Sequence, residues 1–294
     1  MKSYIYMITS SVLLLACQQD TKQIKTVYKL PKSLKEVSGI TYGSDTRILW
    51  MIEDSGNKNK IYGLDSKGEI VKEITISNTK NIDWEDLTND NSGNLYIGDF
   101  GNNDNERKDL CIYKISKDNL AQKSAKPEYA VNFSYPEQKD FPPKKNDLIY
   151  DVESFFEHKN NFYLFTKNRS KHFDGTTYLY KVPNKAGTYK AQLLGSFKAG
   201  NTFDTAAITS ADISLNDSKV ALLSHTKIFI FEEFKTDNFL SGKVKSVNLG
   251  HNSQKESIIF KDDNTLLIAD EKDKNTGGYL YSVDLREAKL EAQP

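Results

Sequence analysis

Acidic side chains recur beside short apolar segments of this 294-residue chain, and they are the residues best suited to chemistry. Some of them open an apolar segment, and others, joined by an amide, follow the end of the next segment. The nine candidates for binding a metal or ligand are Asp54, Glu85, Asp86, Asp99, Asn102, Glu153, Asp212, Glu256 and Asp270. Ca²⁺ prefers carboxylate, amide and carbonyl oxygens in loose geometry, so this set could hold Ca²⁺ or a polar ligand.

The familiar catalytic signatures are absent from the sequence. It contains no Gly-x-Ser-x-Gly elbow, no His-Glu-x-x-His, no phosphate-binding glycine loop and no Cys-x-x-Cys. The four histidines lack metal-ligand spacing, and only His225 follows an apolar segment in the way that the acids do. No motif therefore decides between a binding protein and an enzyme.

A repeat unit of short strands, present about five times, must position these residues. In each copy an acidic or Ser residue opens a first strand, polar residues end a second strand, and an aromatic-rich third strand follows. The five first strands begin near Val37, Trp84, Val152, Ala211 and Lys255. The repeat predicts an all-β fold, a β-propeller of about five four-stranded blades, with room for an irregular sixth in residues 117–130 or 187–201.

The fifth copy lacks an obvious fourth strand. We expect Lys25–Leu30, at the other end of the chain, to supply it, because that pairing closes the ring and leaves no open inner edge. Residues 25–294 are then a single propeller domain.

Propeller topology brings the polar residues together. The first strand of each blade starts at the face where the second strand ends, so both groups crowd one mouth of the central channel. Carboxylates that lie close together raise one another's pKa, and a bound Ca²⁺ would relieve that repulsion. The alternative for each acid is structural: its carboxylate accepts backbone N–H groups and stabilises a blade junction.

A basic loop is expected at the same mouth. Lys167 and Arg169 lie in it, directly after the second strand of the third copy. They could hold a phosphate or carboxylate group of a ligand, and the alternative is a solvated loop.

The N-terminus has the layout of an export signal. A basic start, an apolar stretch from Tyr4 to Leu15 and the sequence Leu14-Leu15-Ala16-Cys17 resemble a bacterial lipobox. This predicts cleavage before Cys17, acylation of its thiol and a polar tether over residues 18–24. We expect a domain anchored by lipid to a membrane of the bacterial cell envelope, in the periplasm or facing outward; an ordinary secretory signal is the alternative.

Two further properties narrow the partners and the chemistry. The formal net charge of +0 gives no electrostatic case for binding nucleic acid. The second cysteine, Cys111, has no disulfide partner once Cys17 is acylated, and we expect it to be a small buried side chain.

The segments Glu53-Asp54-Ser55-Gly56, Asp83-Trp84-Glu85-Asp86 and Gly98-Asp99-Phe100-Gly101-Asn102-Asn103 resemble a widespread group of exported bacterial β-propellers. That group has Asn-Asp-Ser-Gly, Asp-Trp-Glu-Asp and Gly-Asp-Ile-Gly-Asp-Asn at these places, and its later motifs are similar to those around Glu153, Asp212 and Glu256. The resemblance implies a propeller over nearly the whole mature chain. Glu53 and Asn103 depart from the pattern but keep oxygen ligands.

Two functions follow as hypotheses. The first is a membrane-anchored propeller that binds a ligand or an envelope partner at its acidic mouth without turnover. The second is a calcium-dependent hydrolase of a phosphoester or lactone, in which the metal activates water and Glu153 acts as the base. A Glu at a first-strand start facing an Asp at a second-strand end is similar to the arrangement in calcium-dependent propeller lactonases.

Overall fold

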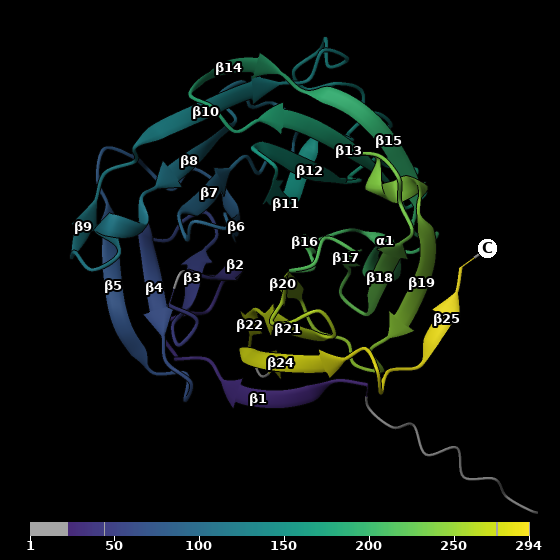
Figure 1. Ribbon diagram of the computed structural model, residues 1–294. Coiled ribbons are helices and arrows are strands. Elements are labelled where there is room, and N and C mark those ends of the chain that lie inside the picture. The colour runs from purple at the N-terminus through teal and green to yellow at the C-terminus, as the bar shows by residue number, and fades with distance from the viewer. Residues whose placement is uncertain (1–22, 44, 275, 294) are drawn as a thin grey trace, which may run out of the picture.

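The chain forms a five-bladed β-propeller in the computed structural model, which describes residues 23–43, 45–274 and 276–293. Five sheets surround a central channel, and the innermost strand of each sheet lines it (Figure 1). This confirms the predicted fold class and fixes the number of blades. Cys17 and most of the expected tether lie outside the described residues.

Four blades contain four consecutive main strands, and the fifth contains three. In order from the channel outward, blade 1 holds β2 (Val37–Tyr42), β3 (Leu49–Glu53), β4 (Lys60–Leu64) and β5 (Ile70–Ile76), and blade 2 holds β6 (Trp84–Asn89), β7 (Leu95–Asp99), β8 (Cys111–Ile115) and β10 (Tyr129–Ser134). In the same order, blade 3 holds β11 (Asp151–His158), β12 (Asn161–Lys167), β13 (Thr176–Pro183) and β15 (Gln192–Lys198), and blade 4 holds β16 (Ser210–Ile213), β17 (Lys219–Leu223), β18 (Lys227–Glu232) and β19 (Lys243–Asn248); blade 5 holds β20 (Lys255–Phe260), β21 (Thr265–Asp270) and β24 (Tyr279–Asp284).

The N-terminal strand β1 (Lys25–Lys29) completes blade 5, as the sequence predicts. It pairs antiparallel with β24, so that Lys25 lies opposite Ser282 and Lys29 opposite Tyr279. The ring is therefore closed by strands from both ends of the chain, and β1 lies on its outer side (Figure 1).

The two segments considered for a sixth blade instead add outer strands to existing ones. The strand β9 (Ser124–Ala125) pairs in parallel with β5, and β14 (Gly187–Lys190) pairs in parallel with β10. A third addition, β25 (Leu290–Ala292), pairs with β19 and has no counterpart among the expected strands.

Each pair of neighbouring blades encloses its own hydrophobic cluster. The strand β3 shows how one strand serves two clusters: Leu49 and Met51 face blade 5, whereas Trp50 and Ile52 face blade 2. Because both faces are buried, such strands are apolar without interruption and do not alternate. All of these strands and clusters lie within residues 23–293, so this part of the chain contains the complete ring and its core.

Hydrogen bonds between inner strands tie the blades together around the channel. Ser257 Oγ accepts a bond from Ile40 N over 2.8 Å, and Ser210 Oγ accepts one from Ile258 N over 3.0 Å. Gly39 stands at the equivalent place in β2, where an added Cβ would lie 2.4 Å from Leu87 N. Only glycine therefore lets β2 and β6 approach this closely.

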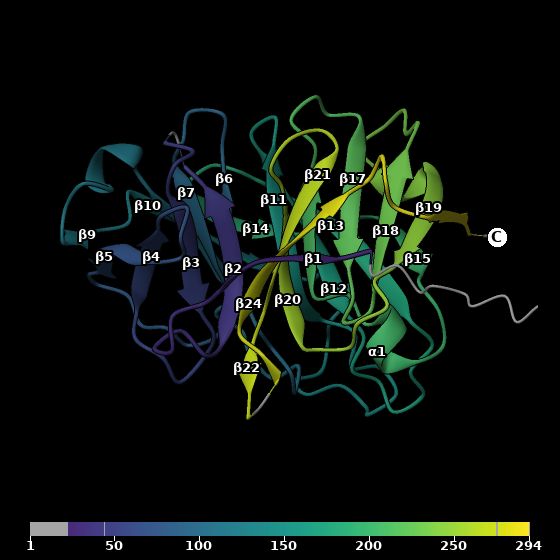
Figure 2. The same ribbon diagram turned by 90° about the horizontal axis from the view of Figure 1, so that it is seen from below.

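Short helices and one hairpin occupy the loops. These are the 3₁₀ helices η1 (Lys117–Asn119) and η2 (Phe239–Ser241), the helix α1 (Phe203–Ala206) and the hairpin of β22 (Lys272–Asp273) and β23 (Thr276–Gly277), which projects from one face of the ring (Figure 2). Among the described residues, none of the helices has the length and apolar character needed to cross a membrane.

Candidate functional site

Bulges near the starts of four inner strands position the central acids of the site. The pairing register shifts between Val37 and Gly39, Trp84 and Asp86, Val152 and Ser154, and Lys255 and Ser257. The extra residues are Ser38, Glu85, Glu153 and Glu256. A β-bulge bends its strand and redirects the extra side chain. The glutamates at these bulges therefore do not follow the regular alternation of side chains between the two faces of the sheet.

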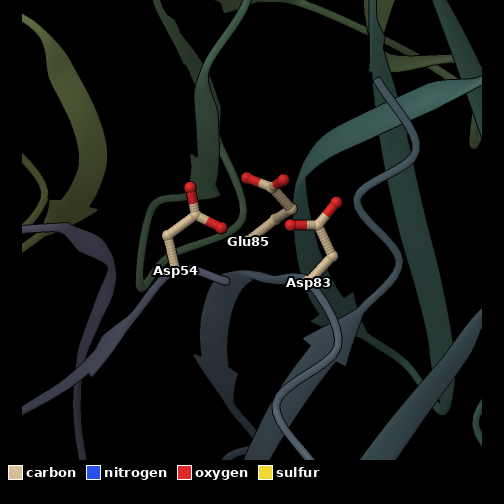
Figure 3. Close-up of side chains that lie close together, drawn as sticks. All are labelled: Asp54, Asp83 and Glu85. Atoms are coloured by element: carbon tan, nitrogen blue, oxygen red, sulfur yellow. The ribbon is translucent and has the colours of Figure 1, made fainter. Parts of the chain in front are cut away.

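Three carboxylates from two blades form a compact cluster. Asp54 follows β3, Asp83 precedes β6, and Glu85 is the bulge residue of β6; one oxygen of each lies within 4.8 Å of the others. The three carboxylates turn toward a shared space (Figure 3). Glu85 is only 7% exposed, and the two aspartates are half-buried.

The electrostatics of the cluster favour protons or a cation. Burial, followed by repulsion from Asp83 and Glu153, raises the pKa of Asp54 to about 7. Burial and the charges of Glu153 and Asp54 raise the pKa of Glu85 well above its ordinary value, and burial raises that of Asp83. The three groups are therefore costly to keep ionised without a positive partner.

The cluster fits a hard divalent cation. All three donors are carboxylate oxygens, the ligand type that Ca²⁺ prefers, and no described residue donates a hydrogen bond to the Glu85 carboxylate. Gly101 adjoins them so closely that an added Cβ would lie 2.2 Å from Glu85 Oε1 and 2.4 Å from Asp83 Oδ2. A buried acidic cluster that could hold a metal is thus present at the mouth.

A second group of acids is neutralised by the chain's own cations. Lys167 Nζ lies 3.1 Å from Glu153 Oε2 and 3.9 Å from Glu256 Oε2. Arg169 bonds both Glu153 and Asp151, the latter over 2.7 Å. Burial alone would raise the pKa of Glu153, but the two cations lower it to about 2. The predicted anion-binding side chains are therefore engaged in ion pairs within the mouth.

The mouth as a whole is strongly acidic. Glu271, which follows β21, has a pKa raised to about 9 by burial and by the charges of Glu256 and Asp54. His225 Nε2 lies 3.3 Å from Glu256 Oε1. Lys167 and Arg169 pair with acids of this mouth, and the charge of Arg107 acts on Asp83. These three cations face seven carboxyl groups, those of Asp54, Asp83, Glu85, Asp151, Glu153, Glu256 and Glu271.

Asp99 and Asn102 support the cluster from outside it. Asp99 is fully buried, forms a 2.9 Å ion pair with Arg107 and accepts a bond from the backbone N–H of Asp83. The backbone N–H of Asn102 donates to Asp151 over 2.7 Å. Both residues fix the loop that carries Gly101, so the structure gives them positioning contacts at this mouth and does not place them in the three-acid cluster.

Three other candidates, Asp86, Asp270 and Asp212, are not brought to the cluster. Asp86 accepts the backbone N–H of Phe155 over 3.2 Å, in the role that Ser210 and Ser257 have elsewhere. Asp270 accepts Tyr279 N over 2.8 Å and the Tyr281 hydroxyl over 2.9 Å. The contacts of these two acids match the structural alternative, in which the carboxylate accepts hydrogen bonds from backbone N–H groups.

Asp212 lies toward the opposite end of the channel. It accepts the backbone N–H of Phe260 over 2.7 Å and lines a cavity of about 400 Å³. The far ends of the inner strands surround this cavity, and its other acids already have partners. Asp90 binds Asn94 and Tyr96, Glu157 accepts the backbone N–H of Asn160, and Asp217 lies beside His158. The cavity therefore offers fewer free ligands than the acidic mouth.

The comparisons with known proteins do not identify a ligand. A model of a family described as SdiA-regulated matches residues 16–140, which end in blade 2. No curated protein matches the chain.

Similar solved structures include a chain of a nidogen/laminin complex, virginiamycin B lyase from Staphylococcus aureus and a gluconolactonase from Xanthomonas campestris. Their identities to this chain are 11%, 15% and 10%, and their TM-scores are 0.49, 0.42 and 0.46. The alignments cover 88%, 85% and 92% of this chain and 81%, 66% and 89% of the other. The fold assignment rests on the blades themselves.

The sequence prediction missed two carboxylates of the site, Asp83 and Asp151. Each lies two residues before a bulge glutamate, in Asp83-Trp84-Glu85 and Asp151-Val152-Glu153. The repeated Asp-x-Glu pattern at the starts of two successive blades is the signal that could have found them.

Cys111 is buried, and burial raises its pKa to about 12, which suits a packing role.

Proposed function

We propose that this chain is a lipid-anchored protein of the bacterial cell envelope whose propeller binds a ligand at its acidic mouth without turnover, and that Ca²⁺ is part of the binding site. Asp54, Asp83 and Glu85 would hold the ion. The observation that supports this most directly is the convergence of three carboxylate oxygens within 4.8 Å.

The metal would make an otherwise repulsive mouth attractive to ligands. Ca²⁺ accepts six to eight oxygen ligands, so three carboxylates leave positions for water and for oxygen atoms of a bound molecule. Lys167 and Arg169 would then keep Glu153 ionised beside the metal and limit the excess of negative charge around it. Ligands rich in hydroxyl, carbonyl or carboxylate oxygens suit such a site.

The proposed anchor is compatible with access to the mouth. The lipobox ending at Cys17 motivates it, and β1, the first strand after the expected tether, lies on the outer side of the ring (Figure 1). A tether that leaves the ring there does not cross the channel.

A binding role is preferred to the hydrolase alternative because of Glu153. A general base is most effective when its pKa lies near the operating pH, whereas the pKa of Glu153 is lowered to about 2. Its two ion pairs with Lys167 and Arg169 also occupy its carboxylate. The residue named as base in that alternative is therefore poorly suited to take a proton.

The first prediction concerns calcium and thermal stability. A metal that binds only the folded state stabilises it by about 2.7 kcal/mol at a hundredfold excess over Kd. For residues 18–294 we expect millimolar Ca²⁺ to raise Tm by about 5 °C relative to chelator, measured by differential scanning fluorimetry. Asp83→Asn and Glu85→Gln should abolish the shift, and in chelator Glu85→Gln should be more stable than the wild type because one repulsive charge is gone.

Asp104→Asn is the matched control, since Asp104 is an exposed acid of the adjoining loop. It should keep the full calcium shift. An unchanged Tm of the wild type in Ca²⁺, or an equal shift in the Asp83→Asn variant, would contradict the proposed site.

A further inference from the structure

A small apolar pocket surrounded by lysines lies at the rim of the ring. Its volume is about 240 Å³, and it lies between the segment that joins β1 to β2 and the β22–β23 hairpin. Leu30, Pro31 and Leu34 supply its apolar lining. Four lysines complete it: Lys29, Lys32, Lys35 and Lys272.

The lining is held by the fold and is not a product of loose loops. Leu30 and Leu34 are 4% and 1% exposed and belong to the hydrophobic cluster between blades 5 and 1. Leu30 N donates to Gly278 O over 2.9 Å, and Lys272 N donates to Lys35 O over 2.7 Å. Both walls of the pocket are thus tied to each other by backbone bonds.

The lysines of the pocket have acidic neighbours in sequence, Glu36 beside Lys35 and Glu271 beside Lys272, but no ion-pair partner among the described residues. Across residues 23–43, 45–274 and 276–293, none of the four lysines forms an ion pair. Lys29 Nζ lies 5.7 Å from the ring centroid of Tyr279, and Lys32 and Lys35 are exposed. Four ammonium groups around an apolar surface attract a molecule that carries an anionic group on an apolar body.

We propose that this pocket binds a small carboxylic acid with an apolar tail. The volume of about 240 Å³ limits the tail to a short apolar chain. The tail lies against Pro31 and the aliphatic stems of the lysines, above the buried Leu30 and Leu34, and the carboxylate is held by lysine ammonium groups. This site is separate from the acidic mouth and does not depend on a metal there.

A soluble acid fits better than an anionic membrane surface. The exposed Glu36 directly follows Lys35, and Glu271 directly precedes Lys272. An anionic bilayer spread over the pocket would also approach the Glu36 carboxylate and be repelled by it, since exposed charges interact over about 8 Å at physiological ionic strength. A single small anion can enter the pocket without approaching the mouth.

Titration calorimetry of residues 18–294 with sodium octanoate tests the proposal. We expect saturable one-to-one binding, at least about fivefold weaker binding of 1-octanol, and no binding of octylammonium, because only octanoate satisfies both the apolar lining and the lysines. Failure of octanoate to bind at millimolar concentration, or equal affinity for 1-octanol, would overturn it.

Charge reversal at the rim supplies the second arm of the test. The double variant Lys32→Glu with Lys35→Glu should weaken octanoate binding at least about fivefold while its Tm stays that of the wild type. Lys185→Glu, at an exposed lysine between β13 and β14, is the matched control and should bind normally. Asp83→Asn should also bind octanoate normally, which separates this site from the calcium site. Unchanged affinity in the double variant, or binding to phosphatidylglycerol vesicles without binding to octanoate, would refute the proposal.

Discussion

At the scale of single residues, the acids of the mouth are held in an environment that opposes their charge. Burial and mutual repulsion raise the pKa of Asp54 to about 7 and that of Glu271 to about 9. The second group of acids has permanent partners, since Lys167 and Arg169 bind Glu153. The metal-free protein therefore carries an electrostatic cost that a proton or a cation at Asp54, Asp83 and Glu85 would remove.

This cost predicts an unusual dependence of stability on pH. Asp54 and Glu271 titrate near 3.8 and 4.5 when unfolded, so between about pH 4 and pH 9 the folded state binds more protons than the unfolded state. In chelator the Tm should therefore fall as the pH rises through this window. Because Ca²⁺ replaces those protons, its stabilising effect should be small near pH 5 and large near pH 8.

Melting curves at several pH values, with chelator and with Ca²⁺, measure both effects. Glu153 has the opposite sign: its depressed pKa gives stability that is present above about pH 4.5 and is lost as the pH falls toward 2. Asp54→Asn should flatten the chelator curve near neutral pH. A Tm in chelator that rises from pH 5 to pH 8 would show that the mouth acids are not the dominant titrating groups.

The residues of the site were only partly predictable from sequence. Glu85 and Glu153 open strands, and a strand start can be located from the apolar run that follows it. Asp83 lies one residue before its strand, where a polar residue usually belongs to a turn, although it completes the cluster. The role of Lys167 depends on Glu256, which is 89 positions away in sequence, and no local pattern reveals that contact.

At the scale of elements, one position links neighbouring blades in three of the five inner strands. Ser210 and Ser257 accept a backbone N–H of the next inner strand, and Asp86 accepts the backbone N–H of Phe155. The equivalent residue in β11 is Ser154, whose buried hydroxyl has no hydrogen-bond partner within the described part of the chain. Four inner strands thus share one position but differ in whether it forms a bond.

That difference gives a matched pair of substitutions. Ser257→Ala leaves the buried N–H of Ile40 without its acceptor, which should lower the free energy of unfolding by about 1–3 kcal/mol. Ser154→Ala removes a hydroxyl that makes no bond, so it should be neutral or slightly stabilising. Urea denaturation of both variants measures the difference. Equal effects of the two substitutions would mean that the inter-blade bond contributes nothing to stability.

The strands of the blades were predictable because burial on both faces leaves a strong signal. The starts expected for the five inner strands are correct for β2, β6 and β20 and lie within one residue for β11 and β16. The additional outer strands were missed for the opposite reason. In β14 three of four residues are exposed and in β25 all three, so neither has an apolar pattern, and their pairing depends on the blade beside them.

At the scale of the whole molecule, closure of the ring determines where the chain leaves it. β1 occupies the outermost place of blade 5, so the described chain enters the propeller from its outer side (Figure 1). Of the expected tether, residues 18–24, the last two are held by the domain: Ile24 is buried in the cluster between blades 4 and 5, and Gln23 Oε1 accepts the backbone N–H of Lys289. The remaining five residues, 18–22, can extend about 17 Å at most. A lipid on Cys17 would thus hold the ring close to a membrane by its side and leave the channel open.

The anchor can be tested by labelling the chain with a fatty acid. In cells that produce the full chain with an alkyne fatty acid, we expect the wild type to take up the label and Cys17→Ala to lose it, because acylation requires the Cys17 thiol. Cys111→Ala is the matched control: this buried cysteine is the only other one in the chain, and its replacement should leave labelling intact. Label retained in Cys17→Ala, or absent from the wild type, would show that the chain is exported without a lipid at this residue.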